Sequence, residues 1–452
     1  MYIVHCMVHC MVHCMMDFLL SAAARLQPVF TQRRLGSLCL VPLLFAISGC
    51  ELASFARVAY ANANSSYQWS GDQRVTTVPF KLIDNHIILP VRVNGSEPLN
   101  FVLDSGAGAT VIIDSRASRA LNLVKDGELT VSGVGDGAGP VANLVPNTTL
   151  AIGDLSLAGQ IAIYLPLDAI PFFNELDDVY FDGVIGAPFF ERFIVEIDHD
   201  QQLIHLLEPL DTYRQAYEGG GWQSLPLEVA GGVPYATLQF QAVAGQSVAV
   251  KLLVDTGARA ALMLTPATHS GLALPVEYFA STGQGLSGDV PGRVAMADAL
   301  ILAGQTLADV PVDYAIAGGE SDNDSNGIVG NEVLRRFNQV YDYSRARLLL
   351  RPNQQFVTAM SADRSGLQIR PHGAGGIVRS IATGSAAQAS SLEVGDIITS
   401  FDNVRVNLHS IRALKQALAS ASNSVELCWL SGGAQTCERI VLASRFRRDG
   451  AG

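Results

Sequence analysis

The sequence has few charged residues, and basic residues are the minority among them. Charged residues make up 16% of the 452 positions, and 42 Asp and Glu residues against 30 Lys and Arg residues give a formal net charge of -12. Binding to nucleic acid requires a basic surface that neutralises the phosphates. The charge balance therefore argues against nucleic acid as a partner.

Aromatic residues are also scarce, at 7%, whereas 49% of the residues are hydrophobic and 42 are glycines. Low charge with a large apolar fraction is typical of chains that bury sizeable cores, which argues against long disorder. Glycine-rich turns between short apolar runs favour a mainly β structure over a helical bundle. The length is sufficient for about two to four domains.

Long hydrophobic runs are missing as well. The apolar run at 38–47 is shorter than the ~20 residues that a transmembrane helix needs. It follows Arg33 and Arg34 and precedes small residues, which is the pattern of an export signal. The sequence "ISGC" at 47–50 resembles the lipobox of bacterial lipoproteins. That resemblance implies cleavage before Cys50, lipidation of its sulfur and a periplasm-facing membrane anchor.

Two other interpretations of the N-terminus stay open. Ordinary signal cleavage near Ala61 would release a soluble periplasmic protein, and the apolar run would otherwise be a buried segment of a cytosolic protein. The repeat "VHCMVHCMVHCM" further upstream contains residue types that bind metals. It precedes the export signal and would be removed with it, so no metal site is expected there.

Cysteine is rare after the signal, where only Cys428 and Cys437 remain. Both lie in "VELCWLSGGAQTCERIVL", which predicts a β-hairpin. If residues 431–434 form its loop, the two cysteines face each other directly and are close enough for a disulfide. An exported protein meets the oxidising conditions that this bond requires. The alternative is a pair of free buried thiols.

What the chain does contain is an internal repeat. The segments "FVLDSGAGATVI" at 101–112 and "KLLVDTGARAALML" at 251–264 share an apolar strand that ends in Asp, a small hydroxyl residue and Gly. Asp104 and Asp255 are 151 residues apart (255 − 104), and the later Gly186 and Gly330 are 144 apart (330 − 186). Similar offsets along the whole unit indicate a duplication.

The repeat and the composition predict the following organisation. Residues 1–50 are an upstream segment with the export signal, and the polar residues 51–76 are a tether. The duplicated lobes occupy 77–215 and 225–353, and a third unit occupies 364–445. In that unit the apolar spacing of Leu408, Ile411, Leu414 and Leu418 predicts a helix over 408–421.

The two aspartates are the candidate catalytic residues. A pseudo-two-fold axis would bring Asp104 and Asp255 together, and two carboxylates in contact cannot both ionise easily. They then share one proton, which supplies an acid and a base in the same site, as in the aspartic proteases that exemplify this effect. A water between them could be deprotonated by one aspartate as it attacks an amide carbonyl, whose oxygen the other protonates. No metal and no cofactor is expected in this scheme.

The neighbours of the aspartates suit a close approach of two loops. Ser105 and Thr256 provide hydroxyls that can bond to the opposite loop, and Gly106 and Gly257 carry no Cβ. "VIG" at 184–186 and "IVG" at 328–330 are expected to pack beneath the loops. The predicted supporting residues are Ser105, Gly106, Thr256, Gly257, Gly186 and Gly330.

These motifs resemble those of the retropepsin/pepsin-like aspartic proteases. The matching parts are "LDSGA" with "VDTGA" and "DGVIG" with "NGIVG", and the resemblance covers about 77–352. It implies a bilobal, pseudo-two-fold β fold with an extended substrate in the cleft between the lobes. It also implies flaps over that cleft, for which the candidates are 132–140 and 281–292, with mobility supplied by glycine. Their key glycines are Gly133, Gly135, Gly283 and Gly285.

The third unit resembles a bacterial PDZ domain through "GSAAQASSLEVGDIITSFDN". The resemblance implies a small α+β domain that binds a peptide as an added strand beside a helix. Its candidate carboxylate-binding loop is 364–369, where Gly366 and Leu367 offer backbone N–H groups. The alternative is a PDZ fold that only packs against the protease.

Together these features predict an aspartic endopeptidase of the bacterial cell envelope. Its substrate would be a polypeptide, which the PDZ domain recruits or presents, and a lipid on Cys50 would hold it at the membrane. The second hypothesis is a non-catalytic peptide-binding protein that uses the same cleft and the PDZ groove. Retention of both aspartates and both hydroxyl neighbours favours the first hypothesis.

Overall fold

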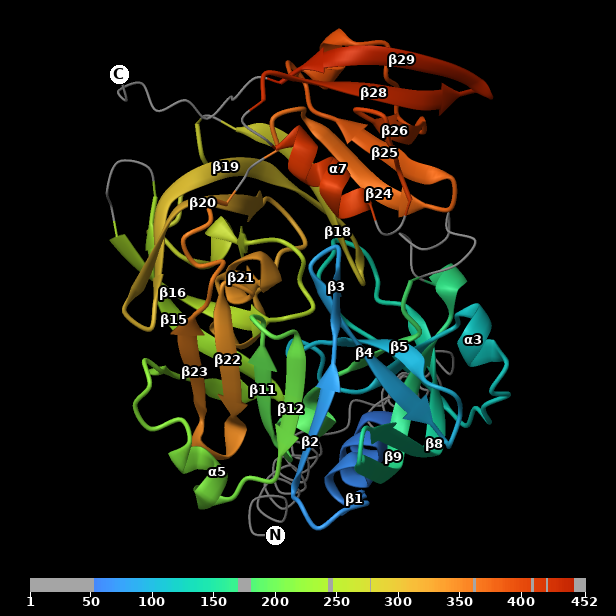
Figure 1. The fold of residues 1–452 in the computed structure, drawn as a ribbon, viewed down its shortest axis with the longest axis vertical. Coiled ribbons are helices and arrows are strands. Elements are labelled where there is room, and N and C mark those ends of the chain that lie inside the picture. Colours follow the sequence, from blue (N-terminus) through green and yellow to red (C-terminus); the bar gives the residue numbers. More distant parts are fainter. Residues whose placement is uncertain are drawn as a thin grey trace, which may run out of the picture. The chain divides into compact units, whose positions relative to one another are not determined.

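The computed structural model describes residues 53–169, 180–242, 247–276, 278–360, 363–407, 410–419 and 422–442. The predicted export signal and Cys50 lie outside these residues. Strands dominate the described chain, as the sequence predicts (Figure 1). None of its described helices combines the length and the apolar character that a membrane span requires.

The first lobe is built on a sheet of nine described strands. Their order is β1-β9-β6-β10-β5-β4-β8-β7, with β3 paired to β4. The strands are β1 (Ser66–Trp69), β3 (Lys81–Ile83), β4 (His86–Val93), β5 (Leu99–Leu103), β6 (Val111–Ile113), β7 (Glu128–Thr130), β8 (Val141–Ile152), β9 (Leu155–Leu165) and β10 (Gly183–Ile185). The turn after β4 uses Asn94 and Gly95, both at positive φ, which suits a tight hairpin turn.

The second lobe repeats this plan with eight described strands in the order β14-β15-β16-β21-β17-β20-β19-β18. They are β14 (Glu228–Ala230), β15 (Val233–Gln241), β16 (Ser247–Asp255), β17 (Leu262–Leu264), β18 (Phe279–Gly285), β19 (Gly288–Leu302), β20 (Gln305–Ala315) and β21 (Gly327–Gly330). In each lobe a short strand, β10 or β21, runs parallel to the strand that carries the candidate aspartate. The two copies therefore have the same strand arrangement around the candidate site.

A third sheet joins the lobes, in the order β13-β23-β22-β11-β12-β2. Its strands are β2 (Val75–Pro79), β11 (Ile194–Asp198), β12 (Leu203–Leu207), β13 (Gln223–Pro226), β22 (Phe337–Asp342) and β23 (Arg347–Pro352). Glu196 on β11 lies directly opposite Val340 on β22. These two residues have the same spacing in sequence as Gly186 and Gly330, so the pseudo-two-fold axis passes between them. One apolar core extends through both lobes and this sheet.

Among the described residues of the lobes, short helices lie between strands of these sheets: α3 (Arg116–Arg119), α4 (Ala187–Phe190), α5 (Asp211–Gln215) and α6 (Asn331–Leu334). Two of them, α4 and α6, begin immediately after Gly186 and Gly330.

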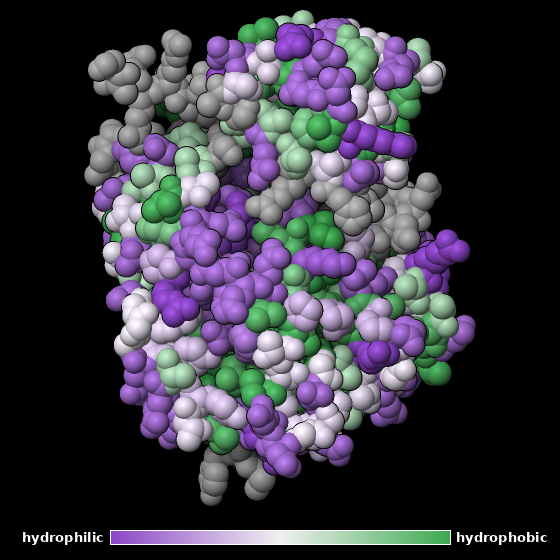
Figure 2. Space-filling model, viewed as in Figure 1, coloured by the Kyte–Doolittle hydropathy of each residue, from purple (hydrophilic) through white to green (hydrophobic). Residues whose placement is uncertain are grey.

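On the face of the molecule shown in Figure 2, hydrophilic and hydrophobic residues are interspersed.

The C-terminal unit has a separate sheet and a separate core. It contains β24 (Leu367–His372), β25 (Gly375–Ile381), β26 (Ile397–Phe401), β27 (Val404–Arg405), α7 (Ile411–Leu418), β28 (Ser424–Ser431) and β29 (Ala434–Val441). Ile411, Leu414 and Leu418 of α7 are buried, as their spacing predicts, whereas Leu408 lies outside the described residues. The described helix is shorter than the predicted range 408–421.

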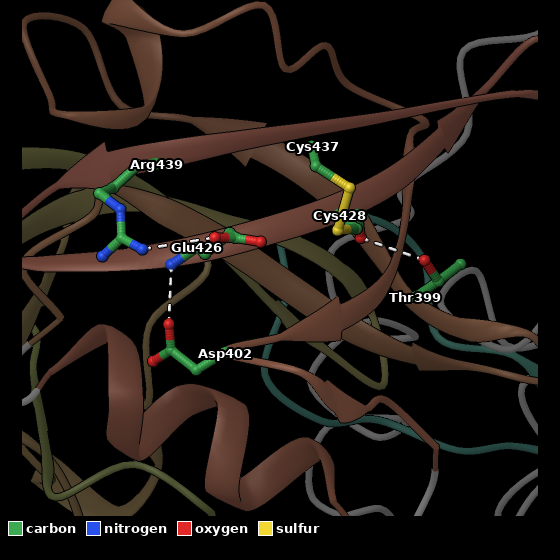
Figure 3. The surroundings of a disulfide bond; sticks show 6 residues. All are labelled: Thr399, Asp402, Glu426, Cys428, Cys437 and Arg439. Atoms are coloured by element: carbon green, nitrogen blue, oxygen red, sulfur yellow. Dashed lines mark hydrogen bonds and ion pairs between the residues drawn. A yellow bond between two sulfur atoms is a disulfide. The ribbon is translucent and has the colours of Figure 1, made fainter.

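The C-terminal hairpin has the predicted register. Ser431 pairs with Ala434, and Cys428 lies opposite Cys437, with 4.0 Å between their Cα atoms. A disulfide joins the two sulfurs (Figure 3). Thr399 on β26 donates a hydrogen bond to the Cys428 carbonyl, which ties the bridged hairpin to the rest of the sheet. The alternative of two free thiols is wrong for this structure.

Residues 53–76 differ from the predicted tether. Residues 53–63 form a helix, β1 follows within the expected tether range, and β2 begins at its end. Val58 of this helix is 8% exposed and packs in an apolar cluster of the first lobe. The prediction followed the polar composition of 62–74, but backbone pairing and a few apolar contacts suffice to order this segment.

The disulfide gives a first prediction. Replacing both Cys428 and Cys437 by Ala should destabilise the C-terminal unit by about 2–3 kcal/mol, because the short loop is no longer closed in the unfolded chain. Hydrogen exchange of the β28 amides would measure the loss. A reducing agent should reproduce it in the wild type and have no effect on the double variant. Equal protection of β28 in both proteins would contradict the prediction.

Candidate active site

Both candidate aspartates lie at the carboxyl ends of buried strands. Asp104 follows β5, and Asp255 is the last residue of β16. The Asp104 N–H donates to the Ile185 carbonyl at 2.9 Å, and Asp255 pairs with Gly330 in parallel register. The β10 and β21 strands thus fix the position of each aspartate in its lobe.

Gly186 and Gly330 lie directly beneath the two loops, as predicted. A Cβ on Gly186 would come within 2.3 Å of the Ala107 carbonyl oxygen, and one on Gly330 within 2.3 Å of the Ala260 oxygen. No side chain fits at such distances, so only glycine lets the loops rest on these strands. This explains why the motif ends in glycine in both copies.

Reciprocal hydrogen bonds join the two loops across the axis. The Ser105 N–H donates to Thr256 Oγ1, and the Thr256 N–H donates to Ser105 Oγ, both at 3.0 Å. Each hydroxyl in turn donates to a strand of the opposite lobe, Ser105 to the Val254 carbonyl at 2.7 Å and Thr256 to the Leu103 carbonyl at 2.8 Å. Both side chains are fully buried. Each hydroxyl therefore serves as donor and acceptor, which satisfies four buried backbone groups.

The carboxylates face each other over the glycines of the motifs. A Cβ on Gly106 would lie 2.6 Å from Cγ of Asp255, and one on Gly257 would lie 2.3 Å from Cγ of Asp104. Each carboxylate also accepts a hydrogen bond from the glycine N–H of its own loop, at 2.8 Å for Asp104 and 2.7 Å for Asp255. The structure therefore brings the six predicted supporting residues and both aspartates into one cluster.

The two aspartates differ in their electrostatic surroundings. Burial raises the pKa of Asp104 well above its usual range, and the negative charge of Asp255 and the hydrogen bond to it raise that pKa further. Burial also raises the pKa of Asp255, but hydrogen bonds from Asp104, Gly257 and Ala258 oppose this. Both pKa values are raised, and the two carboxyl groups in contact favour a state in which the pair holds one proton.

Both aspartate side chains line a cavity of about 1690 Å³, which also reaches Phe55 of the helix 53–63 and Lys415 of α7. Apolar residues of β6 and β9, such as Val111 and Ile163, line it from the first lobe. Met263 and Asp313 line it from the second lobe. The size exceeds that of usual small-ligand pockets and suits an extended chain.

The predicted flaps meet each other over this cavity. The first is the loop 131–140 between β7 and β8, and the second is the tip of the β18–β19 hairpin. Ser287 at the second tip donates its N–H to the Val134 carbonyl at 2.9 Å and accepts from Gly137 N–H at 2.7 Å. Backbone hydrogen bonds thus close the two tips onto each other.

The flap glycines have a further role besides the predicted mobility. A Cβ on Gly135 would lie 2.2 Å from the Ser287 carbonyl carbon, and one on Gly285 would lie 2.1 Å from the Val134 oxygen. A Cβ on Gly133 would lie 2.9 Å from that of Leu286. At these positions glycine permits the contact between the flaps. Gly283 lacks this constraint, because its nearest neighbour would be at an ordinary 3.4 Å.

Comparison with known protein families identifies these units. Residues 89–189 and 241–333 match the family model for aspartyl protease, and residues 354–428 match that for the PDZ domain. The two lobes, which carry the aspartyl protease match, are named the protease domain. A PDZ domain follows them.

The structural neighbours of the chain include a crystallised aspartic proteinase from Irpex lacteus. The match has 12% sequence identity and a TM-score of 0.40, and it covers 63% of this chain and 99% of that one. The search of curated proteins found no match.

The protease domain also contains a contact to the active-site loop that the motifs do not indicate. His86, the first residue of β4, lies 3.0 Å through Nε2 from the Gly257 carbonyl, and its Nδ1 lies 2.6 Å from the Tyr180 hydroxyl. Burial lowers the pKa of His86 to about 3, so the ring is neutral. A neutral ring donates from Nε2 to the carbonyl and accepts from Tyr180 at Nδ1. No signal in the sequence marks this pair, because only the folded sheet brings 86 beside 257.

Beside His86, one aspartate connects the protease domain with the PDZ domain. Asp84 is 6% exposed and accepts hydrogen bonds from Arg259 at 2.5 Å and from Lys415 of α7 at 2.7 Å. Burial alone would raise the pKa of Asp84, but the two cations outweigh it and hold that pKa below its usual range. A PDZ side chain thus pairs with a residue beside the active-site loop, which fits the hypothesis that the two domains pack together.

The candidate carboxylate-binding loop of the PDZ domain is already hydrogen-bonded internally. The Gly366 N–H donates to Asp363 Oδ2 at 2.5 Å, and the Leu367 N–H donates to Ser365 Oγ at 3.1 Å. A peptide carboxylate would therefore have to displace these side chains. Binding of a peptide by Gly366 and Leu367 stays a prediction.

The part of the chain that the structure describes contains no set of side chains arranged to bind a metal ion. No group of three or more His, Cys, Asp or Glu residues is arranged there to hold an ion. The repeat of His and Cys near the N-terminus lies outside the described residues.

The reciprocal hydrogen bonds give a second prediction. Thr256→Val removes the hydroxyl, so the buried Ser105 N–H and Leu103 carbonyl each lose their hydrogen bond to it. This should lower the free energy of unfolding by about 3 kcal/mol. Thr256→Ser keeps the hydroxyl and should cost about 1 kcal/mol or less. Urea unfolding of both variants, followed by intrinsic fluorescence, measures the difference. Equal stability of the two variants would show that the hydroxyl does not join the loops.

Proposed function

We propose that this protein is an aspartic endopeptidase that hydrolyses peptide bonds with a water activated by Asp104 and Asp255. The observation that carries the proposal is the pairing of these carboxylates across a pseudo-two-fold axis, at the base of a cavity large enough for an extended peptide. Their unequal surroundings supply one acid and one base. The aspartyl protease match supports the same reaction class.

The proposed reaction proceeds in two steps. In the first, Asp255 accepts a proton from the attacking water while protonated Asp104 donates its proton to the carbonyl oxygen of the peptide. This yields a neutral tetrahedral intermediate. In the second, a carboxyl group donates a proton to the amide nitrogen, the C–N bond breaks, and the other carboxylate takes back a hydroxyl proton. The pair ends with one proton, as it began.

The surrounding residues hold the two carboxylates in place and cover the site. Hydrogen bonds from the glycine N–H groups hold each carboxylate toward the axis. The flap contact covers the site, and exclusion of water strengthens each charge interaction in the reaction. The flaps must separate to admit a chain, which requires the backbone hydrogen bonds between their tips to break.

We further propose a location and a role for the PDZ domain. Export as a lipoprotein anchored through Cys50 would place the protease on the periplasmic side of a bacterial membrane, and cleavage near Ala61 would give a soluble periplasmic form. The PDZ domain would recruit or present polypeptides to the cleft. The lipobox resemblance and the disulfide in the PDZ domain support an extracytoplasmic compartment.

Substitution of the aspartates tests the reaction. Asp104→Asn and Asp255→Asn should each lower peptide cleavage at least about 1000-fold, because neither pair can hold one proton between an acid and a base. Cleavage of a peptide library, followed by mass spectrometry, measures this. Asp72→Asn, a change at an exposed loop aspartate, is the control and should cleave at the wild-type rate. Undiminished cleavage by either dyad variant would refute the assignment.

The same pair predicts the dependence on pH. Cleavage requires ionised Asp255 and protonated Asp104, so it should fall as the pH drops through the pKa of Asp255 and as it rises through that of Asp104. Both pKa values are raised, so the bell-shaped profile should lie above the usual range of aspartate. Folded-state stability from these groups is present at low pH and is lost as the pH rises through the pKa of Asp104.

Asp104→Asn should therefore flatten that loss of stability. At neutral pH its melting temperature should equal or exceed that of the wild type, since no charge is forced into contact with Asp255. Thermal melts at pH 5 and pH 8 compare the two proteins. A lower melting temperature for the variant at pH 8 would contradict the pKa order.

A further inference from the structure

The duplication allows the two sides of the cleft to be compared residue by residue. In the first lobe Val111 of β6 pairs with Ile163 of β9, and in the second lobe Met263 of β17 pairs with Asp313 of β20. One step further along, both lobes have a tyrosine at the paired position, Tyr164 in β9 and Tyr314 in β20. Ile163 and Asp313 therefore occupy the same place in the two lobes.

These equivalent positions have different surroundings. Ile163 is 7% exposed and belongs to an apolar cluster that includes Val58 of the helix 53–63. Asp313 is partly exposed and lines the cavity beside Met263 and Pro311. Within the described chain no donor hydrogen-bonds to the Asp313 carboxylate and no cation pairs with it. Both positions line the cavity, but the apolar one packs in a cluster of apolar side chains, whereas the acidic one has no polar partner within the described chain.

The neighbouring strand does not supply a counter-ion. Arg293 of β19 lies beside Tyr314, but its guanidinium donates to the Pro275 carbonyl at 3.0 Å and stacks 4.1 Å over the ring of Tyr278. Burial alone raises the pKa of Asp313, to about 6. A partly desolvated carboxylate gains most from a cationic partner, because an opposite charge favours its ionised form.

A second acidic residue lines the same side of the cavity. Glu320 follows β20 and accepts a hydrogen bond from the Asp322 N–H at 2.9 Å. Burial and the charge of Asp322 raise the pKa of Glu320, to about 7. Asp313 and Glu320 thus place two carboxyl groups on the second-lobe wall, and the position equivalent to Asp313 on the first-lobe wall is the apolar Ile163.

We propose that Asp313 is a specificity-determining residue that binds a lysine or arginine side chain of the substrate in a subsite of the second lobe. The inference rests on the proposed peptidase function and names its substrate class. The pseudo-two-fold axis passes through the scissile bond, so equivalent subsites bind residues on opposite sides of that bond. The preference for a basic residue is therefore one-sided, and the opposite side selects no cation.

The test compares cleavage by the wild type, Asp313→Asn and Asp313→Ile. The substrate is a library of synthetic 12-residue peptides that represents every amino acid at each position, and mass spectrometry locates the cut bonds. The wild type should prefer Lys or Arg over an uncharged residue by about tenfold at one position on one side of the cut, as expected for a hydrogen-bonded charge pair. Both variants should lose this preference and retain cleavage of peptides with neutral residues there.

Two further variants sharpen the test. Asp309→Asn changes an exposed aspartate on the same strand and should leave the preference unchanged. Asp313→Lys reverses the charge and should make the enzyme prefer Asp or Glu at that position. A basic preference that persists in Asp313→Asn, or cleavage without any basic preference, would overturn the inference.

A binding measurement separates this inference from the proposed function. Immobilised Asp255→Asn retains peptides from the same library, and the double variant with Asp313→Asn serves for comparison. Enrichment of Lys or Arg that depends on Asp313, without cleavage by the wild type, would refute the peptidase function and support the subsite. Cleavage by the wild type without such enrichment would support the peptidase function and refute the subsite. Absence of both binding and cleavage would overturn both.

Discussion

The contact between the Ser105 and Thr256 loops is the constraint on which the rest of the molecule depends. Each hydroxyl accepts from the opposite backbone and donates to the opposite strand, so neither lobe satisfies its own buried groups without the other. This contact sets the separation of the lobes at the axis. It also forces the two carboxylates together, since each one faces the glycine of the opposite loop. Burial raises the pKa values of both aspartates, and the charge of the neighbouring Asp255 raises that of Asp104 further.

Around this symmetric centre the duplicated lobes have diverged. The first flap is an irregular loop and the second is the tip of a long hairpin, yet their backbones hydrogen-bond to each other. The helix 53–63 covers an apolar surface of the first lobe, and the second lobe places Asp313 at the equivalent position. The symmetric part of the fold therefore accounts for the proposed chemistry, and its asymmetric part for the proposed choice of substrate.

The PDZ domain contacts a residue beside the active-site loop of the second lobe. Lys415 of the PDZ helix binds Asp84, which also binds Arg259, four residues after Asp255. His86, two residues from Asp84, contacts the Gly257 carbonyl in the same loop. A buried carboxylate between two cations keeps its charge, so this connection between the domains is electrostatic and persists over a wide range of pH.

The sequence by itself determined the repeated motifs, and with them the lobes, the facing aspartates, their hydroxyl neighbours and the glycines beneath them. It also determined the register of the cysteine hairpin, because two residues opposite each other in a hairpin are fixed by the position of the turn. These features are local, and each depends on spacing along the chain. The helix 53–63 was missed because the polar residues 62–74 that follow it resemble a linker. The contacts of His86, the pairing of Asp84 with Lys415, and the open carboxylate of Asp313 were decided only by the tertiary structure. Each of them joins residues that are distant in sequence, and burial or a missing partner exists only once the sheets have packed.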